Sequence, residues 1–230
     1  NPAGAAADSD GVRHMLYAVS DPEMIDALVR AASDCTILIA DGHHRYETAL
    51  KYYQLKADDA YGYVMMTLVS KTDPGLVIRP FHRLLKKEGL SIPSSLVSAL
   101  ESFFSCENLG TAKMSAVNSF LDGNGGWDML YMDKQTGTLY GLRINGEGTG
   151  YLNNHRIWHS DAWLNLNVSK INLLCLEGVL NISLDGEVLH DILDFVNNAE
   201  AAFDAVAQTE DYYGCFFIRP IDITTINTIV

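Results

Sequence analysis

The stretch "IADGHHRYETAL", from Ile39 to Leu50, marks the point where an extended part of the chain gives way to a helix. The apolar run Cys35–Ala40 predicts a short buried strand. A helix is predicted from about His43 to Ala57, because apolar residues follow the helical spacing at Tyr46, Ala49, Leu50 and Tyr53. Residues 42–45 therefore fall at the N-terminus of a helix.

A helix start attracts anions, because its first backbone N–H groups have no partner inside the helix and the macrodipole is positive there. Basic side chains are unfavourable at this end unless an anion neutralises them. We therefore interpret His43, His44 and Arg45 as signs of a phosphate-like ligand. Gly42 lets the backbone approach the ligand closely. Asp41 could cap the helix or hold a histidine in one tautomer.

This pattern predicts that phosphate oxygens lie on the backbone of residues 42–45, where His44 and Arg45 can stabilise developing charge. Catalytic roles are assigned to Asp41, His43 and Glu47, with Asp41 or Glu47 as a general base or a Mg²⁺ ligand. Two alternatives stay open. The cluster could be ordinary polar surface, or His43 and Glu47, one helical turn apart, could share a metal ion, although no two further ligands are visible.

The stretch "RPFHR", Arg79–Arg83, follows one strand and one turn later. Arg79, His82 and Arg83 are further candidate phosphate ligands, because a guanidinium can grip a phosphate group with two hydrogen bonds. If the strands predicted at 35–40 and 64–70 are neighbours, this turn faces the same pocket. The alternative is a solvated loop.

Several blocks of the sequence resemble the DUF1015 family, a group of bacterial and archaeal proteins without established function. "IADGHHRYETAL" and Tyr63–Leu85 resemble specific blocks of that family, while Val168–Leu180 and Cys215–Ile223 match its later parts more weakly. The family usually has an additional N-terminal segment and a C-terminal Lys-Ser-Thr motif. Because neither is visible here, we expect the chain to be a fragment of a longer protein.

Family members are often named ParB-like, and the motif is similar to that of the ParB/sulfiredoxin superfamily, where it cradles nucleotide phosphates at a helix start. The resemblance implies phosphate contacts for Gly42, His44 and Arg45, and a nucleotide with Mg²⁺ as the ligand. His43 stands where sulfiredoxins have their cysteine, so sulfinic acid reduction is not expected. The implied fold is a ParB/sulfiredoxin-like core with a second α/β subdomain.

The whole chain is predicted to be a mixed α+β protein in two parts. Residues 1–90 carry the motif, residues 91–230 form the second part, and the boundary lies near 86–95. Residues 1–11 are predicted to be a flexible leader. Strands are predicted at 11–20, 35–40, 61–70, 76–85, 127–132, 138–144 and 212–219. Helices are predicted after Asp21-Pro22, at 43–57, 96–104, 111–121, 172–179 and 197–207, and from Pro220 onward. Residues 189–195 fit either a helix or a strand.

The composition limits the possible partners. With 230 residues and a formal net charge of −13, the surface repels nucleic acid, although a local basic pocket could still hold one small phosphate ligand. No apolar run reaches the roughly 18–20 residues that span a bilayer. There is no signal-peptide pattern either. We therefore expect a cytoplasmic protein without a membrane partner. The four cysteines are far apart and are predicted to be reduced thiols.

Two further patterns indicate structural roles. His155 and His159 have the i, i+4 spacing of metal ligands, but no third ligand follows at a known spacing, so we interpret this segment as aromatic-rich surface. "DGNGG", Asp122–Gly126, lacks the Lys-Ser/Thr of a P-loop and is predicted to be a loop.

Three functions remain open at this point. The chain could be a phosphotransferase or nucleotide hydrolase, a non-enzymatic regulator that senses a nucleotide or phosphometabolite, or, with least support, a ParB-like DNA-associated protein. The sequence leaves the oligomeric state open.

Overall fold

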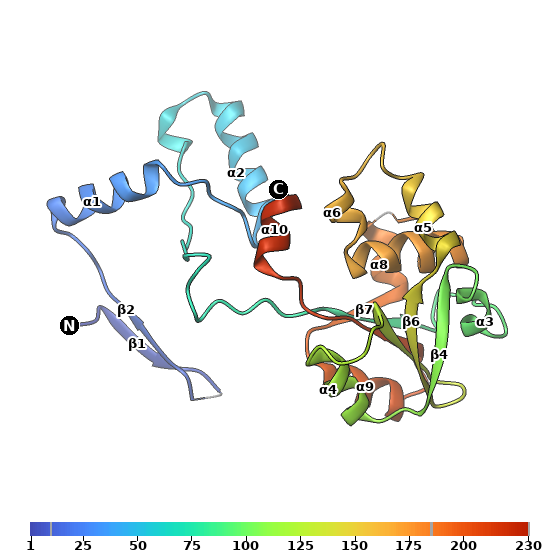
Figure 1. Ribbon diagram of the computed structural model, residues 1–230. Coiled ribbons are helices and arrows are strands. Elements are labelled where there is room, and N and C mark those ends of the chain that lie inside the picture. Colours follow the sequence, from blue (N-terminus) through green and yellow to red (C-terminus); the bar gives the residue numbers. More distant parts are fainter. Residues whose placement is uncertain (10, 185, 230) are drawn as a thin grey trace. The chain divides into compact units, whose positions relative to one another are not determined.

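A computed structural model describes residues 1–9, 11–184 and 186–229, and for residues 186, 187 and 227 it describes the backbone only. The chain has an α+β fold and divides by its internal contacts into two compact units (Figure 1). Unit 1 is Asn1–Leu68 and unit 2 is Val69–Val230. The domain boundary expected near residues 86–95 stays a prediction.

Unit 1 contains a two-stranded antiparallel sheet and two helices. Its elements are β1 (Gly4–Ala7), β2 (Arg13–Leu16), α1 (Pro22–Ser33), α2 (His43–Lys56) and the 3₁₀ helix η1 (Asp59–Tyr61). The prediction of a flexible leader at residues 1–11 is wrong for Gly4–Ala7, which pairs with Arg13–Leu16. Asp10 lies outside the described residues. The predicted helices after Asp21-Pro22 and from His43 are confirmed.

The strands predicted at 35–40 and 61–70 are absent from the structure, where η1 covers Asp59–Tyr61 and the rest of both runs has no regular structure. The residue types were those of buried strands, but a strand exists only when a neighbouring strand pairs with its backbone groups. Within the described residues of unit 1, the only strand pairing is between β1 and β2. No described residue of this unit is buried.

Unit 2 is built on a six-stranded sheet in which all neighbouring strands are antiparallel. The order across the sheet is β4-β6-β5-β8-β3-β7. The strands are β3 (His82–Lys86), β4 (Phe104–Thr111), β5 (Met129–Asp133), β6 (Thr138–Ile144), β7 (Leu193–Val196) and β8 (Tyr212–Phe217). The hairpin of β5 and β6 and the strand β8 confirm the predictions for those segments. The strand predicted at 76–85 begins only at His82, after Pro80.

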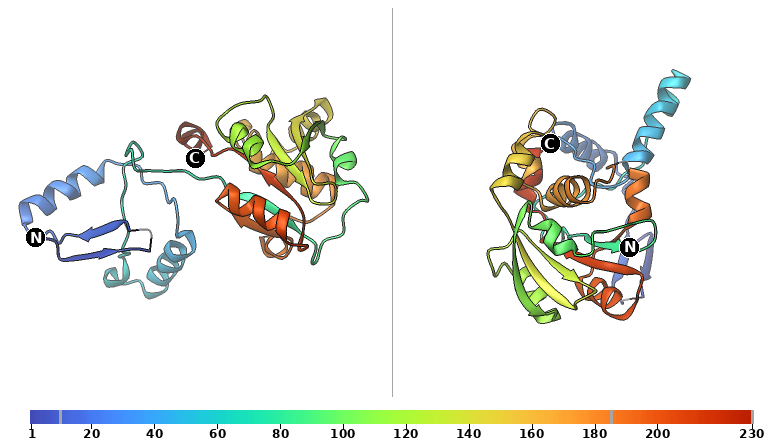
Figure 2. Two further views of the ribbon diagram at one scale, coloured as in Figure 1. Left: turned by 90° about the horizontal axis from the view of Figure 1, so that it is seen from below. Right: turned by 90° about the vertical axis from the view of Figure 1, so that its right-hand side faces the viewer.

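Helices cover both faces of this sheet (Figure 1 and Figure 2). On one face lie α3 (Leu96–Leu100), α5 (Gly146–Asn153), α6 (Asp161–Leu164), α7 (Asn167–Lys170), the π-helix η2 (Ile171–Val179) and α8 (Gly186–Ile192). On the other face lie α4 (Met114–Leu121) and α9 (Ala199–Gln208). The last helix, α10 (Ile223–Ile229), follows β8. It confirms the helix predicted from Pro220 onward. The last residue of that predicted segment, Val230, lies outside the described residues.

The central strands send alternate side chains into two hydrophobic cores. In β5, Met129 and Tyr131 enter the core beneath η2, while Leu130 and Met132 enter the core beneath α4 and α9. Successive residues of a strand point to opposite faces, so a strand that is apolar throughout must be covered on both sides. The uninterrupted apolar sequences of β5 and β8 thus explain why the sheet is a middle layer.

The last third of the chain refines three predicted elements. The segment 189–195, which fitted helix or strand, contains both, because α8 ends at Ile192 and β7 starts at Leu193. The helix predicted at 172–179 is a π-helix with five buried apolar residues. A helix that is apolar on all sides belongs in a core. The helix predicted at 96–104 ends at Leu100, before the strand β4.

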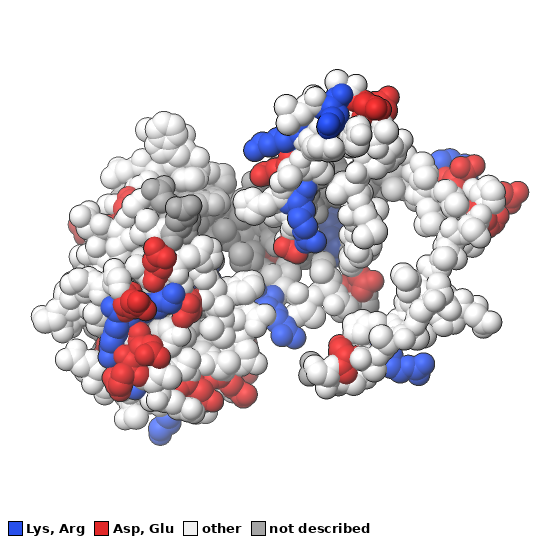
Figure 3. All heavy atoms as spheres, turned by 180° about the vertical axis from the view of Figure 1, so that it is seen from behind, with Lys and Arg blue, Asp and Glu red and all other residues white. Residues whose placement is uncertain are grey.

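Charged side chains of opposite sign lie side by side on the face shown in Figure 3. Among the ion pairs of unit 2, the ammonium groups of Lys87 and Lys134 lie 3.1 and 3.3 Å from carboxylate oxygens of Glu210, whichever face is viewed. Among the described residues, none of the helices combines the length and the apolar character needed to cross a bilayer.

The close packing of β8 against β5 predicts a strong effect of one glycine. A Cβ atom at Gly214 would lie 2.3 Å from the carbonyl oxygen of Met132, so Gly214→Ala must push the two central strands apart. We expect a loss of unfolding free energy of about 1–3 kcal/mol, as for other overpacked core sites, measured by urea denaturation.

The matched control is Gly150→Ala in α5, where a Cβ would meet no atom within 4 Å. Alanine in a helix interior should raise stability there by about 0.5–1 kcal/mol. Equal effects of the two substitutions would contradict the packing argument.

Candidate functional site

The sequence-predicted cluster lies at the start of α2 in unit 1. Gly42 is the residue before the helix and has a left-handed backbone with φ of 82°. No side chain caps the helix, and its first turn contains no acidic residue. The backbone N–H of Tyr46 bonds to the carbonyl of Gly42. Within the described part of the chain, the N–H groups of His43, His44 and Arg45 have no backbone acceptor, as is usual for the first turn of a helix.

Arg45 folds back over this turn. Its Nη2 atom donates a hydrogen bond of 3.2 Å to Oδ2 of Asp41, and both side chains are exposed. The same guanidinium lies so close to Gly42 that a Cβ there would be 2.9 Å from Nη2. Position 42 therefore requires glycine for its φ angle. A Cβ there would also displace the exposed end of the Arg45 side chain.

The other members of the cluster are also exposed. Nδ1 of His44 lies 3.8 Å from a carboxylate oxygen of Glu47, and the His44 side chain is 100 % exposed. An open hollow runs along one side of α2 and is lined by His44, Arg45, Thr48, Ala49 and Tyr52. The basic start of the helix therefore continues into a more apolar surface that ends at an aromatic ring.

Arg79, His82 and Arg83 belong to unit 2 and have different surroundings. Arg79 is exposed, whereas His82 and Arg83 are the first residues of β3 and are buried. Burial lowers the pKa of His82 to about 4, and the nearby Arg83 acts in the same direction. His82 is therefore neutral at pH 7, and its Nδ1 accepts a hydrogen bond of 3.4 Å from the N–H of Ile218.

Arg83 is held mainly by neutral groups. Its guanidinium donates a hydrogen bond to the carbonyl of Phe81 and lies over the ring of Phe195, 4.5 Å from the centroid. Burial lowers the pKa of Arg83 to about 10, which still leaves it charged at pH 7. The alternative of a solvated loop at 79–83 is thus wrong for these two residues, which form part of the sheet. The assignment of Arg79, His82 and Arg83 as phosphate ligands stays a prediction.

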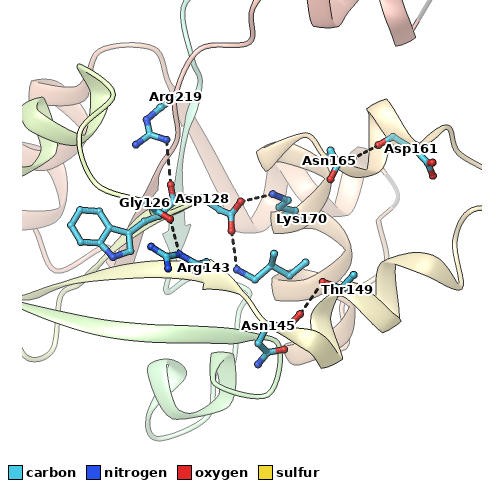
Figure 4. A network of polar contacts seen from close by, with 11 residues as sticks. Gly126, Asp128, Arg143, Asn145, Thr149, Asp161, Asn165, Lys170 and Arg219 are labelled. Atoms are coloured by element: carbon cyan, nitrogen blue, oxygen red, sulfur yellow. Dashed lines mark hydrogen bonds and ion pairs between the residues drawn. The ribbon is translucent and has the colours of Figure 1, made fainter.

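A charged pair that the sequence analysis missed lies beneath the helices of unit 2 (Figure 4). Nζ of Lys170, at the end of α7, is 2.5 Å from Oδ1 of Asp128, which directly precedes β5. The second oxygen of Asp128 accepts a hydrogen bond of 2.8 Å from the N–H of Ile144, at the end of β6. Only 9 % of the Lys170 side chain is exposed.

A partly enclosed cavity of about 110 Å³ adjoins this pair. Lys170, Leu152 and Leu164 are its buried lining residues, and Arg156 and Asp161 are exposed at its rim. The rim also carries three uncharged polar residues, Thr149, Asn153 and Asn165. No sequence signal marks the pair, since 42 residues separate its partners.

A third polar cluster joins α5 to η2. The Tyr151 hydroxyl donates to a carboxylate oxygen of Glu177 at 2.9 Å, and Nε2 of His155 lies 3.4 Å from the same oxygen. The burial of Tyr151 and its bond to Glu177 raise the pKa of the phenol. This contact gives His155 a structural partner within the helical layer. Nearby, the ring of His159 stacks on Trp163 at 3.7 Å.

Arg219, which follows β8, organises the loop predicted at Asp122–Gly126. It donates hydrogen bonds of 2.8–3.3 Å to four carbonyl groups between residues 120 and 127, and it lies over the ring of Phe120. The loop thus has a structural role. Within the described ranges, no group of three His, Cys, Asp or Glu side chains is arranged to hold a metal ion.

The burial of Lys170 predicts that breaking its ion pair is costly. Lys170→Met leaves the Asp128 carboxylate without its partner in a largely buried place, which should lower the unfolding free energy by about 3–5 kcal/mol. The double variant Lys170→Met with Asp128→Asn keeps an acceptor for the N–H of Ile144 and should recover a large part of that loss. Chemical denaturation measures both. Equal stability of the single and double variants would argue against the pair.

The low pKa of His82 predicts an acid-sensitive fold. Below about pH 6.5 the unfolded chain takes up a proton that native His82 binds only near pH 4. The contribution of this residue to stability is therefore present above pH 6.5 and is lost as the pH falls toward 4. The loss is about 3 kcal/mol at most, from roughly 1.4 kcal/mol per pKa unit.

In urea denaturation at pH values from 7.5 to 4, the unfolding free energy of His82→Gln should fall less steeply with decreasing pH than that of the unsubstituted protein. An equal dependence of the unfolding free energy on pH in the two proteins would contradict this role of His82.

Comparisons with known proteins give one match. A family model described as "Protein of unknown function (DUF1015)" matches residues 1–167, which include all of unit 1 and unit 2 up to α6. No curated protein and no solved structure matches the chain.

Proposed function

The chain belongs to the DUF1015 family, and because that family's description assigns no activity, we propose from the chain's own residues that it binds a nucleotide at the start of α2. The observation that carries the proposal is the uncapped first turn after Gly42, with the Arg45 guanidinium folded over it. This arrangement offers backbone N–H donors and a cation to one phosphate group.

The surroundings of the turn favour a nucleotide over a bare phosphate ion. The open hollow continues from His44 and Arg45 along α2 to Ala49 and Tyr52. A nucleoside placed there would contact an aromatic ring while its phosphate stays at the helix start. The resemblance of the motif to the phosphate cradle of the ParB/sulfiredoxin superfamily is a second reason to propose a phosphate at the helix start.

Asp41 and Glu47 supply the acidic groups that phosphate chemistry needs. Asp41 neutralises Arg45, so an incoming phosphate would compete for the guanidinium and release the carboxylate. The released carboxylate is then available to bind Mg²⁺ or to accept a proton, with His43 on the first turn of α2 and Glu47 one helical turn further along. Phosphoryl transfer or nucleotide hydrolysis is the chemistry that this set supports.

The proposal predicts that Arg45→Ala raises the dissociation constant for Mg²⁺-ATP about tenfold to a hundredfold. Hydrogen bonds to charged groups are worth roughly 1.5–3 kcal/mol, which corresponds to that range. Isothermal titration calorimetry on the full chain measures it. Gly42→Ala should weaken binding as well, because alanine resists the φ angle of 82° and would meet the guanidinium.

Arg30→Ala in α1 removes the same charge from the same unit without touching the turn, so its affinity should equal that of the unsubstituted protein. Unchanged affinity in Arg45→Ala would reject the site. Release of inorganic phosphate from bound nucleotide separates an enzyme from a regulator, since a regulator would bind without turnover.

A further inference from the structure

The cavity of unit 2 lies far along the chain from α2 and has a lining of mixed character. Ile144, Leu152 and Leu164 give it an aliphatic side. Lys170 and, at the rim, Arg156 give it two cationic groups. An aliphatic wall with a few converging polar groups is typical of sites that hold a small organic molecule.

The Lys170 ammonium group has more hydrogen-bond donors than its contact with Asp128 uses. An ammonium group carries three N–H donors, and among the described residues this one has a single hydrogen-bond acceptor, Oδ1 of Asp128. Buried polar groups normally have their hydrogen-bonding capacity satisfied by protein, water or ligand. Because Lys170 also lines the cavity, its remaining donors are available to an acceptor inside it.

Arg156 adds donors at the entrance. Its Nε lies 3.0 Å from Oδ1 of Asp161, which uses one of the five N–H donors of the guanidinium. The terminal amino groups remain for a second partner. A guanidinium with free amino groups binds a planar carboxylate through two parallel hydrogen bonds.

The size and the charge of the site select the class of ligand. A cavity of about 150 Å³ holds a benzene molecule, with its six heavy atoms, so one of about 110 Å³ suits a molecule of about four to six. The two cations are already balanced by Asp128 and Asp161, so these four groups carry no net charge. That balance favours a ligand with a single carboxylate over a phosphate dianion.

We propose that this cavity binds a small carboxylate, with the carboxylate group between Lys170 and Arg156 and a short aliphatic part against Ile144, Leu152 and Leu164. A simple alkanoate and a small amino acid share this chemistry. They differ in that the ammonium group of an amino acid would face the Asp161 carboxylate at the rim.

The test is a titration of the full chain, labelled with carbon-13 in its Ile and Leu methyl groups, with propionate, alanine and inorganic phosphate in separate experiments. We expect propionate or alanine to shift the methyl signals of Ile144, Leu152 and Leu164 in a saturable way. Methyl signals of residues outside the cavity, such as Leu130 and Leu139 on the other face of the sheet, should stay in place. Whichever of the two binds more tightly shows whether the cavity takes an alkanoate or an amino acid.

The matched variants are Arg156→Ala and Lys113→Ala, which remove one charge each from exposed positions of unit 2. We expect Arg156→Ala to raise the dissociation constant about tenfold, as the loss of a charge-assisted hydrogen bond does, and Lys113→Ala to leave it unchanged. Neither change touches the buried pair, so both variants should fold. The proposal is overturned if neither carboxylate gives saturable shifts, if the shifts lie elsewhere, if phosphate binds more tightly, or if Arg156→Ala binds normally. None of these outcomes bears on nucleotide binding at α2.

Discussion

The ion pair between Lys170 and Asp128 decides how the helical layer of unit 2 meets its sheet. The Asp128 carboxylate accepts hydrogen bonds from the Lys170 ammonium group and from the backbone N–H of Ile144. One carboxylate, at the start of β5, therefore connects the end of β6 with the end of α7. The chain then continues directly into η2, whose apolar residues fill the core beneath it. A buried pair of this kind adds little net stability compared with apolar side chains, but it penalises every arrangement that separates the two charges. The pair therefore adds a charge restriction to the apolar packing of η2, at a residue that also lines the cavity beside α5 and α6.

Local patterns predicted the elements of unit 2 well wherever short-range chemistry decides them. The hairpin at β5 and β6, the strand β8 and the helices α4 and α9 all carry a clear alternation, turn or helical spacing in their own residues. The order of the strands was beyond such patterns, because β8 pairs with β5 and β3, which lie far away in the sequence. The segment 189–195 fitted two structures for a simple reason, since α8 passes into β7 within it.

The candidate sites also differ in whether their residues are adjacent in the sequence or distant from one another. The start of α2 could be found from sequence because Asp41, Gly42 and the basic residues are adjacent, and the helix forms where the spacing of Tyr46, Ala49 and Leu50 places it. His82 and Arg83 have the residue types of phosphate ligands, but their side chains enter the interior of the sheet, where burial keeps the imidazole neutral. The pair of Lys170 with Asp128 and the contact of His155 with Glu177 bring together residues that no local pattern connects.

The absence of any buried residue among the described positions of unit 1 has a consequence for its energetics. A lone helix of 14 residues, the length of α2, is only marginally stable in water. Segments with little apolar burial open at a small cost in free energy, while the doubly covered strands of unit 2 open only with global unfolding. Part of the binding energy of a ligand that requires a formed α2 would therefore be used to shift the local opening equilibrium toward the helix. Binding of such a ligand would slow amide hydrogen exchange in α2 before it affected exchange in the sheet of unit 2.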